Sequence, residues 1–95
     1  MSSNEHSIKD LIRSIIDKYH ISENMDQASL RSDWEKIMGK LIARHTKSIS
    51  MRGSKLFLTI DSASLKNEIF ISKDKLIERV NEYLGRDVIK SVVIR

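Results

Sequence analysis

Residues 34–60, WEKIMGKLIARHTKSISMRGSKLFLTI, decide the fold because the spacing of their apolar side chains changes midway. Their first part continues a stripe of helical spacing, and Gly39 follows where a glycine favours the end of a helix. Residues 40–45 predict one further helical turn. Residues 46–60 alternate apolar and polar side chains, which is typical of strands with one buried face. The stretch therefore predicts a helix, a short helical turn and a β-hairpin, with Gly53 at the turn.

The predicted hairpin has two unlike faces. Its polar face holds Ser48, Ser50 and Thr59, and Phe57 projects among them. A sheet with one apolar and one polar face is expected to carry helices on the apolar side only. The apolar face is predicted to consist of Ile49, Met51, Leu56, Leu58 and Ile60.

Two helices are predicted before this stretch. Residues 26–38 form the nearer one, with Asp26 as candidate cap and Trp34 on the inner stripe as a core residue, after a polar connection over 20–25. Residues 8–19 form an amphipathic helix capped by Ser7, which either packs on the core or enters the groove of a partner. Its apolar stripe consists of Ile8, Leu11, Ile12, Ile15, Ile16 and Tyr19.

After the hairpin the pattern predicts one long helix over residues 63–84. Asp61 or Ser62 caps its start, and Gly85 ends it in a left-handed conformation. Its segment 69–71 is apolar all round, so it is either deeply buried or briefly irregular. A final strand over 87–95 follows, whose inward-facing set is either Val88, Val92 and Ile94 or Ile89 and Val93.

The element order is therefore α-α-β-β-α-β. A hairpin plus a third strand reached through a helix makes a three-stranded mixed sheet, and helices on one face complete a two-layer α+β fold. The 95 residues are expected to form a tail over 1–6 and a single domain over 7–95.

Composition excludes several classes of protein. The chain has no Cys, so it has no disulfide, thiolate metal site or Cys nucleophile. No apolar run approaches the roughly 20 residues that span a bilayer, and the first residues lack the order of a signal peptide. We therefore expect a cytoplasmic protein without membrane contact.

Catalytic and metal-binding patterns are also missing from the sequence. His6, His20 and His45 are far apart, and no His, Asp or Glu group has metal-ligand spacing. There is no serine elbow, phosphate-binding glycine loop or HExxH motif. We therefore expect a protein that is not an enzyme and that binds no metal, no cofactor and no small-molecule substrate.

The excess positive charge of the chain lies in the same central stretch. Residues 36–60 carry six Lys or Arg and no acidic residue, whereas 1–35 have a net charge of −3 and 61–95 of +1. Such a run predicts phosphate binding, although a solvated face with a Lys-protected edge strand would look the same. Phe57 could stack a nucleic-acid base. The predicted nucleic-acid-binding residues are Lys36, Lys40, Arg44, Lys47, Arg52, Lys55 and Phe57.

Four short motifs, together with the hairpin, carry a resemblance to a known family. The motifs are Trp34-x-x-Ile37-Met38-Gly39, Ile42-Ala43-x-His45-Thr46, Val80-Asn81-x-x-Leu84-Gly85 and Val92-x-Ile94-Arg95. The chain resembles the DciA family of bacterial helicase-loader-type proteins over most of its length.

The resemblance implies a K-homology-like α+β domain that binds DNA, associates with the replicative helicase and has no catalytic activity. Larger members carry an extension that helps to engage the helicase, whereas this chain ends at Arg95. The chain also departs from the Gly-x-x-Gly loop that clamps nucleic-acid backbones in K-homology domains, since Gly39 is followed by Lys40-Leu41-Ile42.

Three hypotheses for function follow. The first is an adaptor in DNA replication that binds single-stranded or tailed DNA and the replicative helicase. The second is an RNA-binding module of similar fold. The third is a protein-interaction domain whose basic residues meet an acidic partner.

Overall fold

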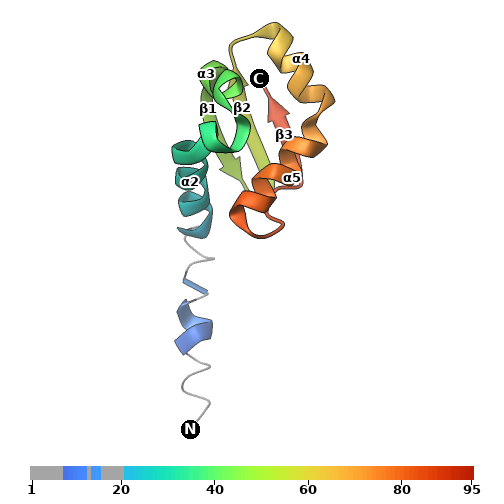
Figure 1. Ribbon diagram of the computed structural model, residues 1–95. Helices are drawn as coiled ribbons and strands as arrows, with labels where there is room; N and C mark the ends of the chain where they lie inside the picture. Colours follow the sequence, from blue (N-terminus) through green and yellow to red (C-terminus); the bar gives the residue numbers. More distant parts are fainter. Residues whose placement is uncertain (1–7, 13, 16–20) are drawn as a thin grey trace.

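The computed structural model describes residues 8–12, 14–15 and 21–95 of the chain (Figure 1). It has the expected α+β class, with a three-stranded sheet in the order β1-β2-β3. Strands β1 and β2 are antiparallel, and β2 and β3 are parallel. The elements are α2 (Ile21–Met38), α3 (Lys40–His45), β1 (Thr46–Arg52), β2 (Lys55–Ile60), α4 (Ala63–Ile71), α5 (Lys73–Leu84) and β3 (Ser91–Ile94).

The hairpin prediction is confirmed in its register and its faces. Ile49 pairs with Leu58 and Met51 with Leu56 across the two strands, and all four side chains are buried. Gly53 has a φ of 59° at the turn, a conformation that costs glycine little. The alternation of apolar and polar residues therefore fixed which side of the hairpin faces the core.

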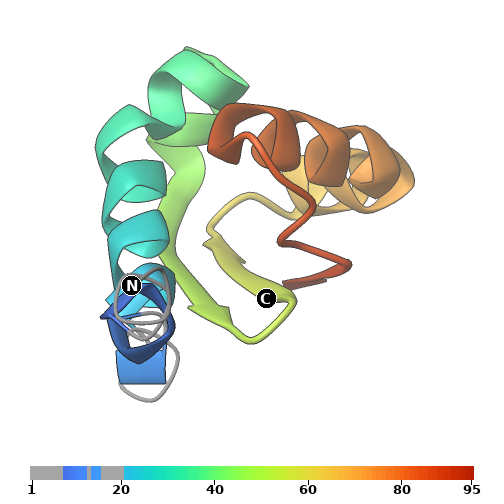
Figure 2. The ribbon, with the colours of Figure 1, turned by 90° about the horizontal axis from the view of Figure 1, so that it is seen from below.

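The core lies between one face of this sheet and helices α2 to α5. Leu30, Trp34 and Met38 reach it from α2, Leu65 and Ile69 from α4, and Leu76 and Val80 from α5. Figure 2 shows α2 beside β1, and α5 across one face of the sheet. Trp34 is only 4% exposed, which confirms its predicted place in the core.

Helix α2 begins at Ile21, so the predicted start at Asp26 and the polar connection over 20–25 are wrong for the described residues. Asp26 does not cap a helix; its carboxylate pairs with the guanidinium of Arg86, far along the chain. Tyr83 adds a second link, because its hydroxyl donates to Asp33 over 2.6 Å. These contacts with the segment 83–86 hold α2 in place. They join residues far apart in the chain, so the local sequence pattern does not predict them.

Helix α2 also covers the outer edge of β1. The Arg31 guanidinium donates to the Ile49 carbonyl over 2.9 Å, and the Met51 amide donates to the Gln27 side-chain oxygen over 2.8 Å. An edge strand otherwise presents such groups to other chains. Side chains of the helix thus replace a neighbouring strand along this part of the sheet.

The predicted single helix over residues 63–84 is wrong, because Ser72 divides it into α4 and α5. Ser72 has non-helical backbone angles, and its hydroxyl donates to the Glu68 carbonyl over 2.9 Å. Serine side chains compete in this way with the helical ladder. Of the two interpretations of 69–71, irregularity is confirmed and deep burial is not, since Phe70 is 59% and Ile71 is 74% exposed. Ser62 caps α4 by accepting from the Leu65 amide.

The connection from α5 to β3 depends on Asn81. Its side-chain oxygen accepts from the Val88 and Ile89 amides over 3.0 and 2.8 Å, and its amide donates to the Ile89 carbonyl over 2.9 Å. Gly85 ends α5 in the left-handed conformation, as predicted. The strand covers only Ser91–Ile94. Val88 and Ile89 therefore precede the strand, and the two predicted inward-facing sets do not exclude each other. Ile89 is buried before the strand begins, and Val88, Val92 and Ile94 pack against the core as well.

The N-terminal helical segment does not bury its stripe. Residues 8–12 and 14–15 are helical, as predicted, but Ile8, Leu11, Ile12 and Ile15 are 43–61% exposed. The interpretation as a core-facing helix is therefore wrong for these residues. The predicted tail over 1–6, the Ser7 cap, Ile16, Tyr19, His6 and His20 lie outside the described residues.

We expect Asn81→Ala to lower the free energy of unfolding by about 1–3 kcal/mol, because the Ile89 amide loses its acceptor and the Ile89 carbonyl loses a donor, whereas the Val88 amide keeps the Arg86 carbonyl. Urea unfolding followed by circular dichroism measures this change. Asn67→Ala is the matched control, since Asn67 is exposed on α4, and it should stay within about 0.5 kcal/mol of wild type. Equal effects of the two substitutions would contradict this role of Asn81.

Candidate nucleic-acid interface

The six cations predicted to bind nucleic acid are all exposed, and they lie at separate places in the fold. Lys36 is near the end of α2, and Lys40 and Arg44 are on α3. Arg52 and Lys55 pair with each other across the hairpin beside its turn. Lys47 lies at the opposite end of β1, roughly 17 Å from Arg52 at the rise of an extended strand. The run of charge in the sequence is thus spread over the length of the hairpin and the two helices before it.

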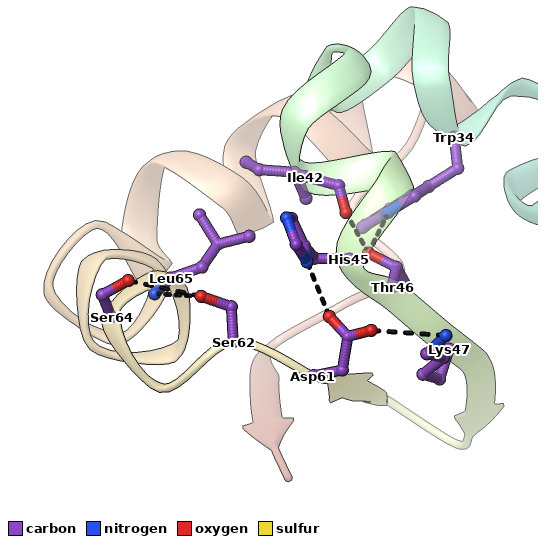
Figure 3. Close-up of polar contacts among 9 residues, drawn as sticks. All are labelled: Trp34, Ile42, His45, Thr46, Lys47, Asp61, Ser62, Ser64 and Leu65. Carbon is purple, nitrogen blue, oxygen red and sulfur yellow. Dashed lines mark hydrogen bonds and ion pairs between the residues drawn. The ribbon is translucent and has the colours of Figure 1, made fainter.

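Lys47 belongs to a polar cluster with His45 and Asp61 (Figure 3). Asp61 Oδ1 is 2.7 Å from His45 Nδ1, and Asp61 Oδ2 is 3.3 Å from Lys47 Nζ. The hydrogen bond with His45 is the main cause that lowers the pKa of Asp61 below its ordinary 3.8; desolvation opposes it and Lys47 supports it. Residues 36–60 contain no acidic residue, but in the folded protein Asp61, the next residue in the sequence, contacts the basic stretch.

Lys36 is directed toward a different part of the molecule. Its Nζ is 3.7 Å from Asp33 Oδ1 one turn earlier in α2. It shares a shallow hollow with Arg79, Glu82 and Tyr83 of α5. Lys36 therefore lies in the helical layer, apart from the polar face of the sheet.

The polar face of the sheet carries Phe57, as predicted. Phe57 is partly exposed on the central strand, opposite Ser50 of β1 and Val93 of β3. The guanidinium carbon of Arg95 lies 4.9 Å from the centre of its ring, within the range of a cation–π contact. The sequence analysis did not include Arg95 in the site. Its position two residues after Val93 was the signal that could have placed it on this face.

The polar partners of Trp34 explain its fixed position. Its indole N–H donates to Thr46 Oγ1 over 3.0 Å, and that hydroxyl donates to the Ile42 carbonyl over 2.6 Å (Figure 3). A buried indole needs such a partner. Gly39, with a φ of 89°, separates α2 from α3 as predicted. Trp34 and Gly39 are therefore structural residues beside the basic stretch.

A hollow of about 370 Å³ lies where α2 and β1 diverge. Arg31 and Lys47 line it, but both already have partners in Ile49 and Asp61.

Among residues 8–12, 14–15 and 21–95, no three His, Asp or Glu side chains are grouped to hold a metal ion. Over the same described residues, no helix combines the length and the hydropathy needed to cross a membrane.

We expect Asp61→Asn to destabilise the protein in a pH-dependent way. Because the pKa of Asp61 is lower in the folded state, its contacts stabilise the fold above the unfolded pKa of 3.8. That contribution is lost as the pH falls through the folded pKa. The difference in urea midpoint between wild type and Asp61→Asn should therefore be present at neutral pH and shrink toward zero at about pH 2. Asp87→Asn, at an exposed aspartate after α5, is the control, and an equal pH dependence for both would contradict the assignment.

Comparison with known proteins places the chain in a family. The model of the family described as "Dna[CI] antecedent, DciA" matches residues 7–94. The chain is also 29% identical over 63 residues to a UPF0232 protein of Corynebacterium glutamicum (strain R). That match covers 66% of this chain and 35% of the relative, so the chain corresponds to about a third of that protein. The family is associated with loading of the replicative helicase. The chain thus belongs to the DciA family, as its Trp34–Gly39 and Val80–Gly85 motifs indicated.

Proposed function

We propose that this chain is a non-catalytic, K-homology-like adaptor that binds single-stranded or tailed DNA and associates with the replicative helicase in the cytoplasm. Membership of the DciA family supports the link to the helicase. The observation that carries the DNA-binding part is the exposed basic stretch. Within the described part of the chain, Lys40, Arg44, Arg52 and Lys55 are exposed and are in no ion pair.

Side chains, rather than a glycine loop, would make the phosphate contacts. The three glycines are Gly39, Gly53 and Gly85, and none is followed three residues later by another glycine. Backbone clamping by a Gly-x-x-Gly loop is therefore replaced by Lys and Arg, which neutralise phosphates and release counterions. Such binding tracks the backbone and does not depend on base sequence.

Lys47 contributes less than the unpaired cations. Asp61 already neutralises part of its charge, and the two must separate before Lys47 meets a phosphate. Lys36 has a weaker partner in Asp33 and lies in the helical layer. Lys40, Arg44, Arg52 and Lys55 are the residues on which phosphate binding chiefly depends.

We expect Lys40→Ala/Arg44→Ala/Arg52→Ala to weaken binding of a labelled single-stranded DNA. Fluorescence anisotropy across a salt series measures the slope of log K against log salt. Three lost phosphate contacts should make that slope shallower by about 2, because each contributes about 0.7 for a single strand. Lys66→Ala/Lys73→Ala/Lys75→Ala removes the same charge from the exposed surface of α4 and α5 and is the matched control.

The same assay separates the alternatives. Tighter binding of RNA than of DNA of equal length would favour the RNA-binding module, because only RNA offers a 2′-hydroxyl. No binding of either polymer at low salt would reject the nucleic-acid proposal. The domain would then be a protein-interaction module for an acidic partner, recovered by co-purification.

The exposed stripe of the N-terminal segment supports contact with the helicase. Ile8, Leu11, Ile12 and Ile15 are spaced by three and four residues and are all exposed. This spacing is typical of an amphipathic helix that enters a groove of another protein. The segment is therefore the part of the chain that we propose to meet the helicase.

We expect Leu11→Ser/Ile12→Ser to abolish co-purification of the replicative helicase, because it removes the centre of the apolar stripe. A pull-down with the tagged chain measures this loss. Phe70→Ser/Ile71→Ser is the control, since it removes an equally exposed apolar pair from the junction of α4 and α5. Loss of the helicase with the control but not with the first variant would assign the contact to that junction instead.

A further inference from the structure

The polar face of the sheet has a composition that suits a single nucleic-acid strand. Its register aligns three rows across the strands: Arg52–Lys55–Ser91, Ser50–Phe57–Val93 and Ser48–Thr59–Arg95. These positions include three cations, four hydroxyls and one aromatic ring, but no carboxylate. Asp61, at the end of the face, is already paired with Lys47 and His45. Glu23 of α2 reaches the hairpin turn, where its carboxylate accepts from the Gly53 amide over 3.3 Å. The positive charge of the face itself comes from Arg52, Lys55 and Arg95.

Phe57 lies at the centre of this face in a fixed position. It is on the middle strand, between Leu56 and Leu58, which are both 0% exposed. Its strand neighbours Ser50 and Val93 have short side chains, and the guanidinium of Arg95 lies over the partly exposed ring. A ring held in this way offers a stacking surface at little cost in side-chain entropy.

Arg95 is also anchored, although it follows the last strand. Its amide donates to the Leu58 carbonyl over 2.8 Å, and its carbonyl accepts from the Ile60 amide over 2.9 Å. These backbone bonds place Arg95 on the same face as Phe57, and its exposed guanidinium lies 4.9 Å from the centre of the Phe57 ring. A planar cation beside an aromatic ring can stack on a base and contact its phosphate at once.

We propose that Phe57 and Arg95 form a stacking site for one unpaired nucleobase on the open face of the sheet. The inference rests on the proposed binding of nucleic acid and adds to it the part of the ligand that is recognised. Base faces are accessible in single strands and hidden in duplexes, so the site discriminates single strands from double strands without reading sequence. Arg52 and Lys55 hold the backbone on one side of the stacked base.

The test compares an oligothymidylate with an abasic deoxyribose-phosphate chain of the same length and charge. Anisotropy competition with wild type should show the base-containing strand binding at least about 5-fold more tightly, since stacking on one aromatic ring is worth that factor or more. Phe57→Leu should remove this preference while the salt slope is retained. Phe57→Tyr should restore the preference, because it keeps an aromatic ring.

Phe70→Leu is the matched control for loss of an aromatic ring. Phe70 also has a cation beside its ring, Lys73 at 4.7 Å, but it lies on α4, away from the sheet face. This variant should keep the preference for bases, and urea unfolding checks that both leucine variants fold.

Three outcomes would overturn the inference. If wild type binds both strands equally, phosphate contacts account for all binding and no base stacks, although the proposed DNA binding stands. If Phe57→Leu folds and keeps the preference, bases stack elsewhere. Absence of binding to either strand at low salt would reject the proposed function together with this site.

Discussion

The two-residue period of strand β2 is the constraint on which the rest of the structure depends. Leu56, Leu58 and Ile60 are almost completely buried, so the central strand commits one face of the sheet to the core. The helices α2, α4 and α5 then have a surface on which to bury Trp34, Leu65 and Val80. The same period forces Lys55, Phe57 and Thr59 onto the opposite face. The core and the proposed stacking site thus both follow from the alternation of residues along β2. A shift of this strand by one residue would move both sets of side chains to the opposite faces.

The edges of this small sheet are controlled by side chains rather than by further strands. Gln27 and Arg31 of α2 satisfy backbone groups of β1, and Asn81 of α5 satisfies the segment that leads into β3. These long-range hydrogen bonds join α2 to β1 and α5 to the segment before β3. They also leave the polar face of the sheet free of helices, which is where a ligand of the proposed kind has access. Stability and the open surface therefore come from the same arrangement.

Charge is distributed so that structural and functional roles are separable. Asp61 forms contacts with His45 and Lys47, and Asp26 with Arg86, where they join elements of the fold. Lys40 and Arg44 on α3, and Arg52 and Lys55 beside the hairpin turn, have no such partner among the described residues. A protein that tracks phosphates needs cations of this second kind, because a paired cation must first lose its partner.

The sequence by itself determined the hairpin, its register, the turn at Gly53, the ends of helices at Gly39 and Gly85, and the burial of Trp34. Each of these follows from a local period or from the φ preference of glycine, so neighbouring residues suffice to predict it. Only the tertiary structure decided the pairing of Asp26 with Arg86, the division at Ser72, the pairing of Asp61 with Lys47 and the position of Arg95 over Phe57. Apart from the division at Ser72, these features depend on contacts between residues far apart in the chain. For the same reason the six cations predicted as one group could be identified from the sequence, whereas their separation between the helices, the start of β1 and the hairpin turn could not.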